Sequence, residues 1–279
     1  MNDYKFFKIL GEKVPSIGMG TWRIGGGFMT PDCSNDKNWI AALRKGIELG
    51  MTLIDTAEVY GRGHSEELVG KAIKGFLRDE LFIVTKVWPG HARRDDVLKA
   101  AEGSVKRLGT YIDLYLLHWP SENVPLCETM KAMEKLIDKG LVRHIGLSNF
   151  ELDDIEKARA CLSKVDIAAV QNRHSLMYRR YENDVIPYCE REGIMFMSYT
   201  PLEKGLLARD PFLAEIGKKY DKTAAQVALN WLIKFKPVVA IPKAGQIEHI
   251  VENAGAMGWR LEKDDWEVIS SKFREYITL

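Results

Sequence analysis

The sequence predicts an α/β protein, a (β/α)₈ TIM barrel with an N-terminal β-hairpin before it and an extra helix after it. Three observations support this fold class. Eight short apolar runs are each followed by a segment with helical periodicity, which indicates parallel strands covered by helices. The strand cores are almost wholly apolar, as in strands buried on both faces. The chain has 279 residues, close to the roughly 250 of such a barrel.

The elements follow in a regular order along the chain. Two runs at 5–10 and 14–16 flank a turn at Gly11, and the β-hairpin they predict would close the barrel floor. Ser65, followed by two acids, is expected to cap a helix, and Gly50 and Gly140 to end two others. The strands are predicted at 16–21, 51–57, 81–87, 111–119, 143–149, 165–172, 194–201 and 238–242. The helices are predicted at 36–49, 65–77, 94–108, 125–139, 152–162, 182–192, 211–220, 223–235, 247–257 and 263–273, the last being the extra helix.

A doubly wound open sheet is the alternative architecture for alternating strands and helices. Such a sheet normally has a Gly-rich phosphate fingerprint at its first strand-to-helix turn. The pairs Gly18/Gly20 and Gly61/Gly63 both lack the third glycine at the required spacing. The barrel is therefore the favoured architecture, as a single domain over residues 1–279.

Composition excludes several broad classes of protein. Hydrophobic residues make up 46% of the chain, charged residues 28%, and the formal net charge is +1, so no global field is available to bind nucleic acid or an anionic membrane. No apolar run approaches the roughly 20 residues of a membrane span, and no signal-peptide core is present near the N-terminus. The four cysteines form no CxxC pair. We expect reduced thiols in a cytoplasmic protein.

Four chemically active side chains follow the ends of consecutive strands. Asp55, Lys86 and His118 interrupt or follow buried strands, and Tyr60 comes shortly after Asp55. Active sites of such barrels lie at the carboxyl ends of the strands. A Tyr phenol has a pKa near 10, which a nearby ammonium lowers, while an Asp keeps that ammonium charged. A neutral His can polarise a carbonyl, so the four together indicate a proton-donating site for carbonyl reduction.

Each of these residues also has a simpler interpretation. An Asp–Lys pair at strand ends is often a structural ion pair, since an unpaired buried charge costs several kcal/mol. A lone His118 could be a core histidine and a lone Tyr60 a surface phenol. A catalytic metal is not expected, because no second His lies in ligand spacing near His118 and His64 is in a Gly-flanked loop.

These residues resemble the aldo-keto reductase superfamily, over almost the whole chain. The motifs that carry the resemblance are GTW at 20–22, DTAEVYG at 55–61, TKVW at 85–88, LHWP at 117–120, GLSNF at 146–150, VQN at 170–172, YTPL at 199–202, and IPK at 241–243 followed by EN at 252–253. They occur in the family's order and spacing.

The resemblance implies a (β/α)₈ barrel that transfers hydride between NADPH and a carbonyl or alcohol. It makes Tyr60 the proton donor in reduction, Lys86 the group that lowers its pKa, Asp55 the partner of Lys86, and His118 the residue that orients the substrate carbonyl. The cofactor-binding residues it implies are Thr21, Trp22, Ser148, Asn149, Gln171, Tyr199, Pro201, Leu202, Ile241, Lys243, His249 and Asn253. Ser148, Asn149 and Gln171 would hold the nicotinamide carboxamide, and Tyr199 would stack on its ring. Trp22, Trp88 and Trp119 would line the substrate pocket, although core packing is the other interpretation of each Trp.

The segment after the eighth strand departs from the family pattern. Many NADPH-dependent members have Ser after the Lys and an Arg further on that clamps the 2′-phosphate. Here Ala244 and His249 stand at those positions, and Lys243 is kept. A bidentate guanidinium is therefore missing there. We expect NADPH to be preferred, with NADH also used and weaker discrimination than in typical members.

The connections that follow the predicted strands are short, which indicates an active site that is open to solvent. Only 119–124 separate His118 from the next helix, and only 274–279 follow the last one. We expect activity on small aldehydes, ketones or sugars, in either direction, by a monomer. Two other functions are compatible with the fold: a Schiff-base aldolase using Lys86, and a cofactor-binding regulatory subunit with little turnover.

Overall fold

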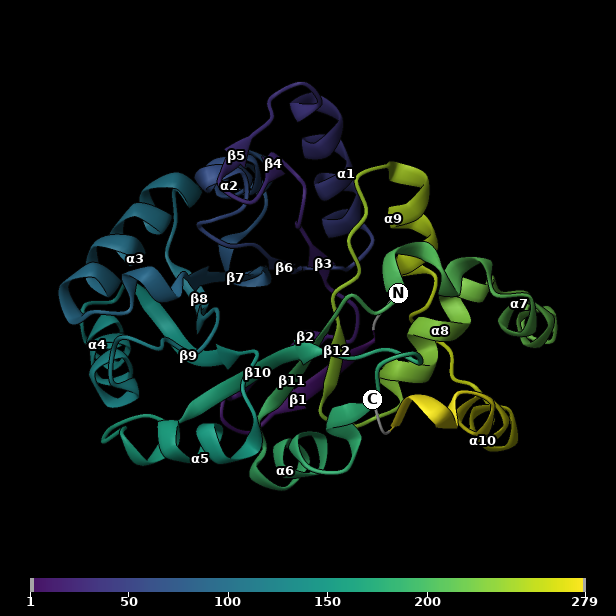
Figure 1. Cartoon of the computed structure of the whole chain (residues 1–279). Helices are drawn as coiled ribbons and strands as arrows, with labels where there is room; N and C mark the ends of the chain where they lie inside the picture. The colour runs from purple at the N-terminus through teal and green to yellow at the C-terminus, as the bar shows by residue number, and fades with distance from the viewer. Residues whose placement is uncertain (1–2, 278–279) are drawn as a thin grey trace.

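A computed structural model describes residues 3–277 and contains one eight-stranded parallel sheet curled into a barrel (Figure 1). Its strands, in sheet order, are β3 (Met19–Gly20), β6 (Leu53–Asp55), β7 (Phe82–Val87), β8 (Ile112–Leu117), β9 (Val142–Ser148), β10 (Ile167–Arg173), β11 (Met195–Tyr199) and β12 (Val238–Ala240). Parallel bridges from Ile17 to Ala240 and from Gly20 to Lys243 join the first strand to the last. The (β/α)₈ fold is confirmed, and this closure excludes the open sheet.

Helices cover the outside of the barrel (Figure 1). They are α1 (Asp36–Glu48), α2 (His64–Ala72), α3 (Arg94–Leu108), α4 (Leu126–Asp138), α5 (Leu152–Ala160), α6 (Val185–Glu192), α7 (Pro211–Lys218), α8 (Ala224–Ile233), α9 (Ile247–Ala254) and α10 (Lys263–Lys272). Each lies within or close to its predicted range, and α10 is the expected extra helix. No helix among residues 3–277 has both the length and the apolar character needed to cross a membrane.

The start of α2 corrects one prediction. Ser65 is not the N-cap, because the helix begins at His64 and its N-cap is Gly63, at φ +92°. The hydroxyl of Ser65 is buried and donates to Thr21 Oγ1 at 2.9 Å. The residue therefore ties α2 to the end of β3 instead of capping its own helix.

The N-terminal hairpin is present and closes the barrel floor. It pairs β1 (Tyr4–Phe7) with β2 (Glu12–Pro15) in antiparallel register, and its turn is longer than expected because residues 8–10 belong to it. Phe7, Leu10 and Val14 are buried against side chains that fill the barrel interior, such as Leu53 and Phe82. The predicted floor is thus confirmed, with a shorter first strand.

A second hairpin lies between β3 and α1, where no element is predicted. It consists of β4 (Gly26–Gly27) and β5 (Thr30–Pro31). Phe28 at its tip forms a bridge with Tyr60, and the amide of Met29 donates to Val59 O at 2.9 Å. Gly61 has φ +56°, and a Cβ there would lie 2.0 Å from Gly25 O, so only glycine permits this contact. The hairpin therefore covers the segment that carries Tyr60.

The expectation of four reduced cysteines is wrong for two of them. Cys127, in the first turn of α4, and Cys161, directly after α5, form a disulfide with their Cα atoms 5.0 Å apart. They are separated by 34 residues in sequence, and packing of neighbouring helices around the barrel brings them together. Sequence spacing could not show this pairing. Cys33 and Cys189 are free thiols.

Candidate active site

The four predicted catalytic side chains meet at the carboxyl ends of neighbouring strands. Asp55 ends β6, Lys86 lies near the end of β7, His118 follows β8, and Tyr60 lies in the loop between β6 and α2. All are buried, and Lys86 has no exposed surface. The ring centroids of Tyr60 and His118 are 5.8 Å apart.

Lys86 connects Asp55 to Tyr60. Its Nζ lies 2.8 Å from the Asp55 carboxylate, 2.8 Å from Thr56 O and 3.4 Å from the Tyr60 hydroxyl. The expected ion pair is therefore present, and all three protons of the ammonium have an acceptor. Asp55 also accepts a hydrogen bond of 2.7 Å from Gln171 Nε2. A buried pair with each group satisfied in this way is held in one geometry.

Burial dominates the electrostatics of this group. It raises the pKa of the Asp55 carboxyl and lowers the pKa of the Lys86 ammonium, and each partner opposes the shift of the other. The pKa of the Tyr60 phenol is raised well above its ordinary value by burial and by the Asp55 charge. The expected lowering by Lys86 is not seen, because desolvation disfavours the phenolate and Asp55 offsets the ammonium.

His118 is a neutral imidazole, and one of its ring nitrogens has no hydrogen-bond partner within the described residues. Burial, and then the Lys86 charge, lower its pKa well below the ordinary value. Its Nδ1 is buried and has no hydrogen-bond partner among residues 3–277. A buried polar atom without a partner is costly, so a ligand that supplies one would bind favourably here.

The residues predicted to hold the nicotinamide form a second network. Asn149, at φ +65° directly after β9, donates from Nδ2 to His118 O at 2.9 Å and to Ser148 Oγ at 3.0 Å. Its Oδ1 accepts from the Tyr199 hydroxyl at 2.7 Å. This network ties the Tyr199 ring to the loop that carries His118. Gln171 Nε2 donates to Asp55 at 2.7 Å and to Met197 Sδ at 3.8 Å, so the carbonyl oxygen of Gln171 is the group left to meet a carboxamide.

Two cationic side chains, Arg23 and Lys243, follow the ends of β3 and β12. Lys243 is exposed at the residue level, and desolvation of its ammonium, followed by the nearby charge of Arg23, lowers its pKa. The two cations therefore lie near each other. Neither forms an ion pair with any residue between 3 and 277. The first turn of α9, a few residues on, has no side-chain cap. Free helix N–H groups beside two cations favour an anion such as a phosphate, so the residues present fit a phosphorylated dinucleotide.

The other predicted cofactor residues follow the same strand ends or lie on α9. His249 is exposed in the first turn of α9, and its Nδ1 lies 3.7 Å from the Glu252 carboxylate. Thr21 is buried, and its hydroxyl accepts a hydrogen bond from the Ser65 hydroxyl. Pro201, Ile241 and Asn253 are buried, and Leu202 is half-buried.

Aromatic rings pack against the tetrad of Asp55, Tyr60, Lys86 and His118. Trp22 lies edge-on to Tyr60 with centroids 4.9 Å apart, and Trp88 lies edge-on to His118 at 5.7 Å. Phe28 adds a third ring, 5.0 Å from Trp88. Trp119 is exposed and makes no ring contact with these within residues 3–277. The structure therefore brings Trp22 against Tyr60 and Trp88 against His118. The place of Trp119, which directly follows His118, in a substrate pocket stays a prediction.

Three residues near the site were not identified from the sequence. Arg23 approaches Lys243, Phe28 covers Trp88, and Glu58 Oε1 accepts the Trp88 amide at 2.7 Å. Glu58 lies within the motif at 55–61 and Arg23 directly follows the motif at 20–22, so their positions could have indicated a place near the site. Nothing in the sequence indicated Phe28, because its hairpin has no alternating pattern of apolar and polar residues.

Comparison with known proteins agrees with this geometry. The profile of the Aldo/keto reductase family matches residues 16–274. A thermostable aldo-keto reductase solved with the inhibitor epalrestat is 44% identical, with a TM-score of 0.91, over 96% of this chain and 98% of that one. An aldo-keto reductase from Klebsiella pneumoniae in complex with NADPH is 37% identical, with a TM-score of 0.89, over 99% and 96%.

Characterised relatives cover nearly the full chain as well. Methylglyoxal reductase YeaE of Escherichia coli is 39% identical over 267 residues, which is 93% of this chain and 91% of that protein. Glyoxal reductase of Bacillus subtilis is 33% identical over 264 residues, 94% and 90% of the two chains. The chain therefore belongs to the aldo/keto reductase family.

Proposed function

We propose that this protein reduces small aldehydes and ketones, 2-oxoaldehydes foremost, with NADPH as the hydride source and Tyr60 as the proton donor. The observation that carries the proposal is the buried chain from Asp55 through Lys86 to the Tyr60 hydroxyl, with neutral His118 beside it. The similarity to a methylglyoxal reductase over 93% of the chain supports the substrate class. The similarity to a reductase bound to NADPH supports the cofactor.

NADPH, when bound, supplies the hydride. The side chains of this protein donate the proton to the substrate oxygen and stabilise the negative charge that develops there. Neutral His118 donates an N–H to the substrate carbonyl oxygen and orients it. The Tyr60 hydroxyl gives its proton to that oxygen, and the Lys86 ammonium, 3.4 Å away, stabilises the phenolate that remains. Asp55 and Thr56 O hold the ammonium in place. Trp22, Trp88 and Phe28 restrict the access of water.

The raised pKa of Tyr60 suits the reductive direction. A phenol whose pKa lies well above 10 is fully protonated at neutral pH, as a general acid must be. An alkoxide formed on the substrate is a stronger base than a phenolate, so proton transfer from Tyr60 to it stays favourable. The reverse reaction needs the phenolate, which burial disfavours.

The pH profile of aldehyde reduction tests this assignment. A general acid loses activity as the pH rises through its pKa, so a raised pKa moves this loss upward; a lowered His118 pKa keeps the imidazole neutral down to a lower pH. We expect kcat with saturating NADPH to stay flat between about pH 6 and pH 9. An alkaline decline centred within that range would show that Lys86 lowers the pKa of Tyr60 after all.

An assay of NADPH consumption over a panel of carbonyls tests the substrate class. We expect methylglyoxal and similar small aldehydes to give the highest kcat/KM, because the connections around the site are short and Phe28 and Trp88 lie across the tetrad. A bulky aromatic ketone is the matched comparison. Preference for the bulky ketone by orders of magnitude would refute the proposed substrate class without refuting the family.

The same assay with NADH tests the phosphate site. We expect higher kcat/KM with NADPH, since Lys243 and Arg23 are cations free to meet its 2′-phosphate, with only moderate discrimination because His249 is engaged with Glu252. Lys243→Met should reduce the NADPH/NADH ratio and leave the rate with NADH nearly unchanged. A strong preference of the unmodified enzyme for NADH would overturn this expectation.

Neither of the other functions gains support from the structure. A Schiff-base lysine must become neutral and reach a substrate carbonyl, whereas Lys86 has no exposed surface and all its protons are engaged. The site of a regulatory subunit needs no proton donor, yet Tyr60, Lys86, Asp55 and His118 are all assembled. The cytoplasmic location and the monomeric state stay predictions.

A further inference from the structure

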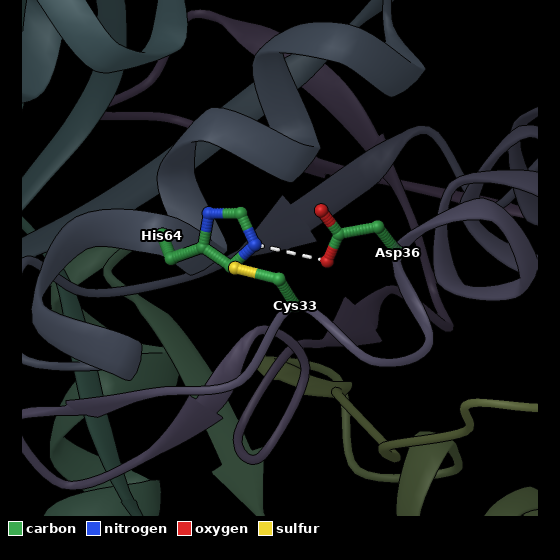
Figure 2. A group of neighbouring side chains, drawn as sticks. All are labelled: Cys33, Asp36 and His64. Atoms are coloured by element: carbon green, nitrogen blue, oxygen red, sulfur yellow. Dashed lines mark hydrogen bonds and ion pairs between the residues drawn. The ribbon is translucent and has the colours of Figure 1, made fainter.

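A second cluster of chemically active side chains lies beside the start of α2, outside the tetrad. Cys33, Asp36 and His64 each present one donor atom, and these three atoms lie within 4.8 Å of one another. Figure 2 shows the three side chains close together, Cys33 and Asp36 from the segment that enters α1 and His64 from the start of α2. Within residues 3–277 no other group of three His, Cys, Asp or Glu side chains meets the same condition.

The backbone that carries the three residues is well held. Cys33 lies in the connection between β5 and α1, Asp36 begins α1, and His64 begins α2. The connection is anchored by the amide of Asp32, which donates to Gly25 O at 3.0 Å, and by Asp32 Oδ1, which accepts the amide of Ser34 at 2.8 Å. The convergence of the three side chains is therefore a property of the fold.

The imidazole of His64 is oriented as in a metal-binding histidine. Its Nδ1 lies 2.9 Å from Glu67 Oε2, while its Nε2 faces Asp36 Oδ1 at 2.9 Å. Histidines that ligate metals almost always bond a carboxylate or carbonyl through the other ring nitrogen, which fixes the ring. Glu67, one turn along α2, occupies that second position.

Charge and access also favour a cation. Asp32, Asp36 and Glu67 place three carboxylates around the single imidazole of His64. The side chains of His64 and Asp36 are 11% and 24% exposed, and Cys33 is exposed. An ion can thus enter from solvent and keep a water molecule. An ordinary His–carboxylate ion pair explains Asp36 and Glu67 and leaves the thiol of Cys33 without a role.

We propose that Cys33 Sγ, His64 Nε2 and Asp36 Oδ1 bind one Zn²⁺ ion, with water as the fourth ligand. One sulfur, one imidazole nitrogen and one carboxylate oxygen form a donor set that suits tetrahedral zinc. The ion replaces the direct hydrogen bond between His64 Nε2 and Asp36 and binds the Cys33 thiolate; the proton of that hydrogen bond and the thiol proton are released to solvent.

Such an ion joins two segments that surround Tyr60. The amides of Gly63 and Ser65, on either side of His64, both donate to Tyr60 O, at 3.1 and 3.3 Å. Cys33 follows the β4–β5 hairpin, whose Phe28 bridges Tyr60. The zinc ion therefore fixes the hairpin to the start of α2 and takes no part in hydride or proton transfer.

Titration of the metal-free protein with Co²⁺, with the Cys127–Cys161 disulfide intact and Cys33 as a free thiol, tests the site through absorbance. We expect one equivalent to produce a near-ultraviolet thiolate-to-cobalt charge-transfer band and intense visible bands of a tetrahedral ion, and Zn²⁺ to displace it. Cys33→Ser should abolish the charge-transfer band, and His64→Gln should weaken binding at least tenfold. Glu67→Gln should weaken it by roughly 10–100-fold, as expected for a residue that orients a ligand.

His249→Gln is the matched control. Like His64, His249 lies in the first turn of a helix near a glutamate three residues on, Glu252 at 3.7 Å. Unlike His64 it is exposed, and it belongs to no Cys/Asp/His cluster within residues 3–277. Its spectrum should equal that of the unmodified protein. Absence of the charge-transfer band, or its persistence in Cys33→Ser, would overturn the proposal. Because the readout is metal binding, it does not depend on whether the protein reduces aldehydes.

Discussion

Tyr60→Phe should lower kcat for aldehyde reduction by roughly 10²–10⁴-fold, the usual contribution of a positioned general acid. The substitution removes the one hydroxyl that lies beside both Lys86 Nζ, at 3.4 Å, and the His118 ring. The phenyl ring keeps its packing against Trp22. The barrel and the residues predicted to bind the cofactor, on β9, β10 and β11 and after β12, are untouched, so the affinity for NADPH should not change.

Single-turnover kinetics measure the loss of the chemical step, and fluorescence titration with NADPH measures the affinity for the cofactor. Tyr111→Phe is the matched control, because Tyr111 also lies near a strand and a cation, the guanidinium of Arg78, but at the opposite end of β8 from His118. It should retain full activity. If Tyr60→Phe kept more than about a tenth of the turnover, the proton-donor assignment would be wrong.

Lys86→Met should destabilise the fold as well as inactivate the enzyme. Asp55 is buried and its main partner is the Lys86 ammonium, 2.8 Å away. Removing one member of a buried ion pair leaves the other charge uncompensated and costs about 3–5 kcal/mol. We therefore expect a large decrease in the free energy of unfolding, measured by urea denaturation.

The pH dependence of that loss identifies its cause. In Lys86→Met the pKa of Asp55, already raised by burial, rises further, so the folded state holds its proton to higher pH than the unfolded state does. A group with a raised folded pKa stabilises the fold at low pH, and this stability is lost as the pH rises. The variant should thus lose less stability at about pH 5 than at about pH 8.

A double variant separates stability from catalysis. Asp55→Asn combined with Lys86→Met leaves no buried charge in the pair, and replacing both partners by neutral groups can be nearly neutral in energy. We expect most of the unfolding free energy to return while turnover stays low, because no ammonium remains beside Tyr60. Recovery of activity in the double variant would contradict the role of Lys86.

Much of the fold could be predicted because its signals are local. Most strand segments contain an apolar run bounded by turn residues, and the helices have an apolar periodicity, so the alternation is readable without knowledge of contacts. The fold class then places the ends of all strands on one rim. This is why Asp55, Lys86 and His118, far apart in sequence, could be expected to meet, and why the ion pair of 2.8 Å was anticipated.

Features that depend on long-range packing could not be predicted. The β4–β5 hairpin has strands of two residues each, too short for any periodicity, and it is held by contacts to Val59 and Tyr60. The disulfide between Cys127 and Cys161 depends on how α4 and α5 lie side by side. The prediction of Ser65 as an N-cap is wrong because its hydroxyl has a partner far away in sequence, Thr21, directly after β3.

By itself, the sequence determined the barrel, the order of its elements and the residues of the tetrad, because residue type and spacing along the chain suffice for these. Only the tertiary structure decided how those residues behave. The direction of the Tyr60 pKa shift depends on how completely its surroundings exclude water, and the proximity of Cys33 and Asp36 to His64 depends on two segments meeting in space. Desolvation and proximity are properties of the packed chain, and no local pattern contains them.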